Sequence, residues 1–257
     1  MKKTLVIGII LLVLSCAGNE DYFSPSGIEV IHGKYLLKEY DEDNKKLYSF
    51  SYAGDYLESN TIYNDQGLTK YKYHYSETGR PDTIFVSQPH YDYYMIPEFN
   101  DTLISLLNVY FEGDLKLKYI MTYDDSNKII QVSKVSIRSG LVARSLFEWE
   151  GNNIKTYEIQ FMLVIPPVDY VYEYKYDNRL NPYKNVFRNI GFNLIDFVPV
   201  SQNNWLTMVG YSKDYPQTRL TIRNQFAYSG PGYPFASSKS RVDYDGSRSE
   251  IFGKFDY

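Results

Sequence analysis

The sequence predicts an all-β fold, an antiparallel meander that forms a curved sheet or a partly open barrel, with one or two short helices. Three observations predict it. The chain has 28 tyrosines in 257 residues, its apolar and polar residues alternate with a period of two, and turn residues recur about every ten positions. Tyrosine favours strands because its flat, amphipathic ring packs well on a pleated surface that is partly buried and partly exposed to solvent.

The alternation is clearest in two segments. KYKYHY (70–75) places tyrosine at every second position and Lys or His between them. YVYEYKYD (170–177) has the same pattern, beginning with Tyr170. Because side chains of a strand point alternately to its two faces, these segments predict strands with one face covered by tyrosines.

Turn residues separate these strands. A degenerate sequence repeat covers residues 48–75, 108–135 and 147–161. Each copy consists of a predicted strand, a glycine beside Asp or Asn, and a second predicted strand. Gly54-Asp55 and Gly113-Asp114 are of the kind that tolerates the positive φ of a tight hairpin turn. The repetition therefore predicts a meander of hairpins.

Two interruptions break the meander. In residues 87–107, Phe99, Leu103, Leu106 and Leu107 fall at helical spacing, while a strand from Leu103 onward fits as well. Residues 181–209 lack an initial period of two, which indicates a short helix and a loop across one end of the barrel or sheet. Because loops carry function more often than strands do, both segments are candidate locations for a site.

A family resemblance follows from the turn and strand motifs. These motifs are Tyr40-Asp41, Tyr123-Asp124, Tyr176-Asp177, Tyr244-Asp245, YKYDNRLNPYKN (174–185) and FAYSGPGYPFASSKSRVDYDGS (226–247). They resemble a Bacteroidetes lipoprotein family whose domain of unknown function has a porin-like, curved β-sheet fold. The pattern is also similar to the tyrosine-aspartate repeats of large shell-forming surface proteins. The resemblance spans most of residues 30–257 and implies a fold rather than a chemistry.

The N-terminus has the layout of a secretory signal peptide. Lys2 and Lys3 precede an apolar run that ends before the small residue Ser15. The run is about half as long as a bilayer-spanning helix. Val13-Leu14-Ser15-Cys16 resembles the bacterial lipobox, in which the peptide is cut before a cysteine that is acylated on its sulfur and on its new amine. We therefore expect a lipoprotein signal peptide over 1–15 and lipidation at Cys16.

Residues 16–28 predict a flexible acylated tether, and residues 29–257 a single repetitive antiparallel β domain. Asn19, Glu20 and Asp21 follow the lipid site closely. They resemble the acidic export signal that sends lipoproteins of Bacteroidetes-type bacteria to the outer face of the outer membrane; a merely solvated linker is the alternative. The expected location is thus the outer membrane, held through the N-terminal lipid and exposed at the cell surface.

Composition narrows the partners. Cys16 is the one cysteine in the sequence, so the exported domain has no disulfide and depends on its core for stability. Losing Lys2 and Lys3 with the signal peptide changes the formal net charge from −4 to −6. An acidic balance disfavours nucleic acid, whose binding depends on basic side chains.

No enzyme signature is present, and we predict a protein that is not an enzyme and takes no cofactor or metal. His32, His74 and His90 lack the spacing of metal ligands. Glu148 and Glu150 share one strand face, which leaves a carboxylate-based glycoside hydrolase as an alternative function; side chains that simply face water explain them as well.

Aromatic side chains remain as candidate binding groups. Trp149 alternates with Phe147, and we expect it to pack in the core. Trp205 follows the polar SQNN segment (201–204), so its ring can stack on a ligand near a loop tip or cap a hydrophobic end. The predicted function is a non-catalytic binding or accessory module for a glycan or an outer-membrane protein, with Trp205 as the candidate ligand contact. A structural envelope component is a further alternative.

Overall fold

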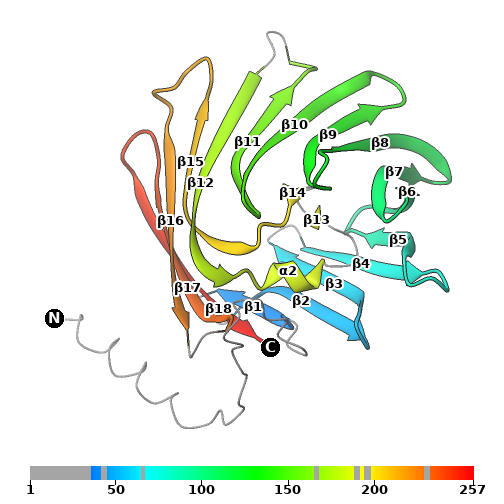
Figure 1. Cartoon of the computed structure of the whole chain (residues 1–257), viewed down its shortest axis with the longest axis horizontal. Coiled ribbons are helices and arrows are strands. Elements are labelled where there is room, and N and C mark those ends of the chain that lie inside the picture. Colours follow the sequence, from blue (N-terminus) through cyan, green and yellow to red (C-terminus); the bar gives the residue numbers. More distant parts are fainter. Residues whose placement is uncertain are drawn as a thin grey trace. The chain divides into compact units, whose positions relative to one another are not determined.

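The computed structural model describes residues 36–41, 45–64, 67–164, 168–187, 192–193, 198–228 and 232–257. Sixteen of the described strands form one closed antiparallel barrel (Figure 1). The predicted all-β meander is confirmed, and the sheet is closed rather than partly open. The predicted signal peptide (1–15) and tether (16–28), with Cys16, Asn19, Glu20 and Asp21, lie outside the described residues, as does His32.

The strands follow the chain around the barrel. In order they are β1 (Lys38–Asp41), β2 (Lys46–Ala53), β3 (Tyr56–Asn64), β4 (Gly67–Tyr75), β5 (Pro81–Ser87), β6 (Asp92–Asn100), β7 (Leu103–Phe111), β8 (Asp114–Tyr123), β9 (Ile129–Ser136), β10 (Gly140–Glu150), β11 (Asn153–Phe161), β12 (Val168–Leu180), β15 (Asn203–Ser212), β16 (Leu220–Tyr228), β17 (Pro234–Val242) and β18 (Arg248–Asp256). Each strand pairs with the next along the chain, and β12 pairs with β15. The barrel closes where β1 pairs with β18, with Lys38 opposite Asp256.

The alternation read from the sequence separates the inside of the barrel from its outside. In β4, Tyr71 and Tyr73 are buried in the core, whereas Lys70, Lys72 and His74 are exposed. The buried core consists of inward side chains such as these, so the tyrosine face of the strand is the inner one.

The predicted glycine turns are present. Gly54 between β2 and β3 has a φ of 60°, and Gly113 between β7 and β8 has a φ of 85°. These are left-handed conformations that side chains with a Cβ rarely adopt, so glycine fits the two tight hairpins.

The helical spacing in residues 87–107 comes from a β-bulge. This segment contains β6 and β7, so the helix considered there is wrong and the strand from Leu103 is confirmed. The register between the two strands shifts after Glu98. Since a bulge adds one residue to a strand, Ile104 and Leu107 both point into the core although they are three positions apart.

Residues 181–209 contain the predicted short helix. They also contain two strands of two residues each and the start of a barrel strand. The helix is α2 (Tyr183–Val186), and β13 (Phe192–Asn193) pairs with β14 (Val198–Pro199). Figure 1 shows these elements inside the ring of strands. From Asn203 onward the segment belongs to β15.

Aromatic packing holds α2 against the inner wall. The Tyr183 ring makes edge contacts with Tyr48 and Phe50, with centroids 6.4 and 6.1 Å apart, and Phe187 after the helix is 1% exposed. Across the barrel from β2, at the β10–β11 turn, the Gln202 amide donates to the Asn152 carbonyl at 3.0 Å. The described residues between β12 and β15 (181–187, 192–193 and 198–202), called here the β12–β15 connection, therefore fill one end of the barrel. This is the end at which β10 turns into β11.

The buried tyrosines predict a loss of stability in alkali. Burial raises the pKa of Tyr119 and of Tyr176 from 10.0 to about 12. Tyrosines of the unfolded chain ionise near pH ~10, so between these two pH values the unfolded state binds fewer protons than the folded state. The free energy of unfolding is then unaffected below the lower value and decreases as the pH rises through the window, by up to about 1.4 kcal/mol per tyrosine per pH unit.

Urea unfolding on both sides of that window, with tyrosinate absorbance recorded in parallel, measures this decrease. A urea midpoint that stays constant until all tyrosines have ionised would show that their burial does not govern alkaline stability.

Candidate functional site

The barrel encloses a cavity of ≈ 610 Å³ between β1, β2, β11, β12, β15–β18 and the β12–β15 connection. Asn181, Pro182 and Val200 of that connection line its closed end. Phe161 and Tyr170, beside the β11–β12 turn at the other end, also line it and are 36% and 37% exposed. The cavity therefore opens at the end of the barrel that the connection does not fill.

Tyrosines of the predicted YVYEYKYD strand form one wall. Tyr170, Tyr172, Tyr174 and Tyr176 of β12 all line the cavity. The Tyr172 ring stacks on Tyr157 of β11, with centroids 5.5 Å apart and planes at 23°. The alternation predicted the shared face, and the barrel places that face on a cavity rather than on solvent.

Trp205 lies next to this wall. It belongs to β15 and lines the cavity, so the loop-tip position expected from the SQNN segment is wrong. The pattern was misleading because β15 begins inside that polar segment, at Asn203. Its ring makes an edge contact with Tyr174, with centroids 6.3 Å apart. Trp205 is half-buried, which leaves part of the indole accessible from the cavity.

The two tryptophans differ in their hydrogen bonds. The Trp149 indole N–H donates to the Ile129 carbonyl at 2.8 Å, and the ring packs against the core, which confirms the prediction for this residue. Among the described residues, none accepts a hydrogen bond from the Trp205 indole N–H. Trp205 therefore offers a cavity ligand both a ring and a donor.

A polar cluster continues from Trp205 along the next two strands. Asn224 of β16 donates from its Nδ2 to the Trp205 carbonyl at 3.0 Å. Asn224 pairs across the strands with Lys239 of β17, and both line the cavity, as does Ser237. The Asn224 Oδ1 is buried without a hydrogen-bond partner. Neither Asn224 nor Lys239 carries a sequence signal, since FASSKS and RNQ lack an apolar alternation that would assign them a face.

Glu39 is the buried carboxyl of the cavity. It is 5% exposed and accepts a hydrogen bond from the Tyr183 hydroxyl of α2. Burial raises the pKa of Glu39, and the Lys239 charge and the Tyr183 hydrogen bond oppose this effect. Sequence reasoning missed Glu39 because it follows a lysine in a strand of four residues, too short to show alternation.

The carboxylates noted in the sequence lie elsewhere. Glu148 and Glu150 of β10 are exposed and do not line the cavity. Asp124 occupies a turn, where its Oδ1 accepts hydrogen bonds from the Ser126 and Lys128 amides, both at 2.9 Å. The predicted solvent-facing and turn positions are therefore confirmed for these three residues, and Glu39 is the acid that the described lining contains.

The described histidines are both on the surface. His74 is exposed on β4, where its ring makes an edge contact with Phe85, and His90 is exposed before β6. No group of three or more His, Cys, Asp or Glu residues within the described ranges is arranged to hold a metal ion. No helix in the described part of the chain is both long enough and apolar enough to span a bilayer.

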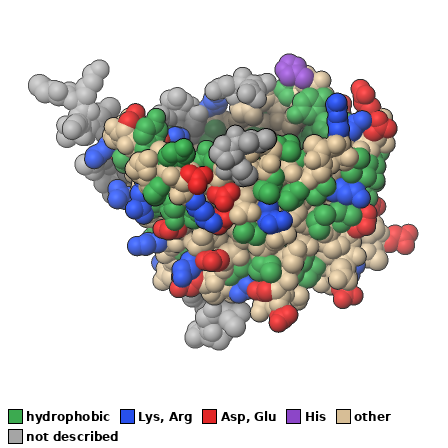
Figure 2. All heavy atoms as spheres, turned by 90° about the horizontal axis from the view of Figure 1, so that it is seen from above, with side chains coloured by type: hydrophobic (Ala, Val, Ile, Leu, Met, Phe, Trp, Pro, Cys, Tyr) green, Lys and Arg blue, Asp and Glu red, His purple; other side chains and the backbone are tan. Residues whose placement is uncertain are grey.

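The outer surface of the barrel carries charged side chains among apolar ones such as Phe85 and Ile120, which are 46% and 42% exposed. Outward positions in the middle of strands carry Lys70, Lys72, Lys155, Glu173 and Lys175, all exposed. Figure 2 shows Lys, Arg, Asp and Glu side chains distributed among hydrophobic ones over one face of the molecule. The inner face holds the apolar core.

The fold and cavity together define a closed antiparallel β-barrel with an internal aromatic site. Two solved structures of similar fold are porin-like proteins. That from Bacteroides uniformis ATCC 8492 is 6% identical, with a TM-score of 0.44 over 77% of this chain and 90% of that one. That from Bacteroides vulgatus ATCC 8482 is 11% identical, with a TM-score of 0.40 over 87% and 99% of the two chains. The chain matches no known family profile and no curated protein.

Proposed function

We propose that this protein is a lipid-anchored lipoprotein of the outer membrane whose barrel stands in water at the cell surface and binds a glycan in its cavity without catalysing a reaction. The aromatic cavity carries this proposal. Protein sites for small ligands are concave, largely apolar and provided with a few polar groups, and this cavity has those properties. By delivering the bound glycan to an outer-membrane protein, the barrel would act as an accessory of that protein.

The composition of the cavity supports a glycan. Sugar rings have an apolar face and a polar edge, and the cavity provides aromatic faces from β12 and β15 beside Asn224 and Ser237. The Trp205 ring lies between the tyrosine wall and these polar side chains. A sugar can therefore stack on aromatic rings and form hydrogen bonds at once.

The charged outer surface supports a barrel that stands in water. A barrel that spans a bilayer has an apolar outer band, and a Lys at the bilayer midplane costs about 2–4 kcal/mol. Lys70, Lys72, Lys155 and Lys175 occupy outward positions on three strands of this barrel. A lipid at Cys16 would then provide the attachment to the membrane.

The direction of the cavity supports capture from the medium. Leu36, the first described residue, is buried, and β1 begins two residues later at Lys38. Strand alternation places the start of β1 at the end of the barrel that the β12–β15 connection fills. The chain therefore enters the barrel at the closed end, whereas the cavity opens at the opposite end.

The positions of the carboxylates favour binding over hydrolysis. Glycoside hydrolases use two carboxyl groups that flank the scissile bond. The described lining of the cavity contains one, Glu39, and Glu148 and Glu150 are exposed outside it. Binding without hydrolysis is thus the function that the geometry supports best.

Trp205→Ala tests the site. The full-length protein, purified in detergent, is screened on an array of plant and bacterial polysaccharides, and affinities for the glycans that bind are measured by titration calorimetry. Because interface energy concentrates in a few aromatic side chains, we expect Trp205→Ala to lose about 2 kcal/mol or more, roughly a thirty-fold decrease in affinity.

Tyr215→Ala is the matched control, since this ring is 61% exposed in the turn after β15 and does not line the cavity. It should bind as the parent does. An array on which no glycan binds would contradict the proposed function. A Trp205→Ala variant that melts normally and binds as tightly as the parent would remove Trp205 from the site.

A further inference from the structure

Two charged side chains line the cavity among the described residues, Glu39 and Lys239. They lie on β1 and β17, with β18 between them. Their surroundings differ, because the Glu39 carboxyl accepts a hydrogen bond from the Tyr183 hydroxyl whereas no described residue accepts one from the Lys239 ammonium. The two groups interact electrostatically, but no ion pair joins them within the described part of the chain.

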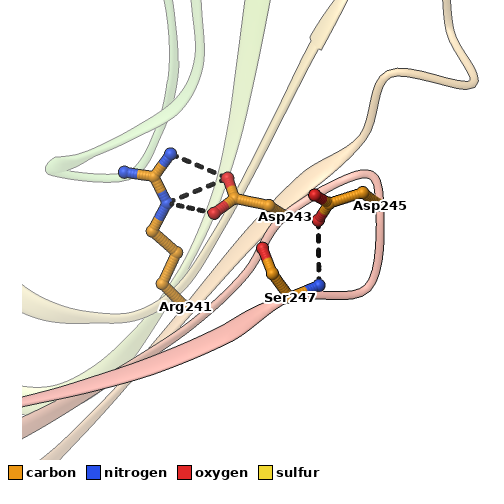
Figure 3. Close-up of polar contacts among 4 residues, drawn as sticks. All are labelled: Arg241, Asp243, Asp245 and Ser247. Carbon is orange, nitrogen blue, oxygen red and sulfur yellow. Dashed lines mark hydrogen bonds and ion pairs between the residues drawn. The ribbon is translucent and has the colours of Figure 1, made fainter.

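The next cation along β17, Arg241, is exposed and forms an ion pair. Arg241 is two residues along β17 from Lys239. Its guanidinium binds both carboxylate oxygens of Asp243, with Nε at 2.9 and 3.0 Å and Nη2 at 2.7 Å from them (Figure 3). Asp243 therefore pairs with Arg241 within the β17–β18 hairpin, whereas no described carboxylate forms such an ion pair with Lys239.

Lys239 also lies beside groups that suit a ligand. Asn224 is its cross-strand partner, and the Asn224 Oδ1 is buried without a hydrogen-bond partner. Through its Nδ2, Asn224 is bonded to the Trp205 carbonyl. Neighbouring strands lie about 5 Å apart, so Trp205 and Lys239 are roughly 10 Å apart at the backbone. One oligosaccharide can reach both.

We propose that the glycan is acidic, and that a sugar carboxylate pairs with the Lys239 ammonium while a sugar ring packs on Trp205. This inference rests on the proposed function. Charge-assisted hydrogen bonds are about twice as strong as neutral ones, and a partly enclosed cavity strengthens them further.

Burial of Glu39 supports the same preference. Its raised pKa favours the neutral carboxyl, which reduces repulsion of a ligand carboxylate near Lys239. The Tyr183 hydroxyl further occupies a Glu39 oxygen. Lys239 is the cation that the described lining offers to a ligand carboxylate.

The test compares acidic oligosaccharides with their own carboxyl-reduced forms. Oligomers of galacturonate, of mannuronate and of hyaluronan, each beside its reduced counterpart, are titrated into the full-length protein in detergent. We expect at least one acidic oligomer to bind ten-fold or more tightly than its reduced form, with a preference that decreases as salt is added. Lys239→Met should abolish that preference, so that the acidic and the reduced oligomer bind with equal affinity, and Lys239→Arg should retain it.

The outcomes separate this inference from the proposed function. Equal binding of acidic and reduced forms by the parent, or a preference that survives in Lys239→Met, would overturn the role of Lys239 and leave glycan binding intact. Binding of none of these sugars nor of any array glycan would overturn both. A saturated fatty acid that binds more tightly than the sugars would assign the cavity to acyl carboxylates instead. If Lys239→Met does not fold, the parent protein still tests the inference. Its salt dependence and its affinities for the acidic and carboxyl-reduced oligomers show whether it prefers a carboxylate.

Discussion

Replacing Phe187 with alanine is expected to lower the free energy of unfolding by about 3–5 kcal/mol. Phe187 follows α2 directly, is 1% exposed and belongs to the buried core. Its ring is one of the largest fully buried side chains in the described residues. Alanine would leave a cavity where the β12–β15 connection meets the inner wall, and the closed barrel limits how far the strands can collapse into it.

Urea unfolding of the full-length protein, followed by tryptophan fluorescence, measures this change. Phe85→Ala is the matched control, because it removes the same side chain from the outer face of β5, where Phe85 is 46% exposed. We expect the control to cost less than about half as much. If the two variants lose equal free energy of unfolding, Phe187 does not contribute more to stability than an outward phenylalanine does.

Replacing Cys16 with alanine is expected to release the protein from the membrane completely. The sequence has no other cysteine to accept a thioether-linked lipid. Acyl chains hold a protein at a bilayer through about 0.8 kcal/mol for each buried methylene, and the charged outer surface of the barrel offers no replacement.

Incorporation of labelled fatty acid, together with fractionation of cells into membrane and soluble parts, measures the release. Ser15→Ala is the control, since it keeps a small residue before the expected cut and should stay lipidated. Labelled fatty acid that is still incorporated into Cys16→Ala would exclude this lipidation site. Membrane retention without any label would instead show that the barrel itself binds the membrane.

Local sequence patterns predicted most of the strands. The face that a side chain occupies and the position of a tight turn both depend on residues that are close together in the sequence. The period of two predicts that Tyr71 and Tyr73 share one face, and the Gly54-Asp55 pair predicts the β2–β3 turn. The pattern failed at Leu103 and Leu106, which are three positions apart and share a face because of a β-bulge, the spacing that also occurs in a helix. A bulge depends on the partner strand, which a single segment does not reveal.

The sequence by itself determined an all-β meander with a tyrosine-covered face, and it placed Trp149 in the core. Only the tertiary structure decided that the sheet closes, since the β1–β18 pair joins Lys38 to Asp256 across nearly the whole chain. Closure turned the tyrosine face into the wall of a cavity and brought Trp205 and Lys239 onto it. Periodicity states which residues share a face of one strand, whereas the curvature and register of all the strands decide what that face encloses.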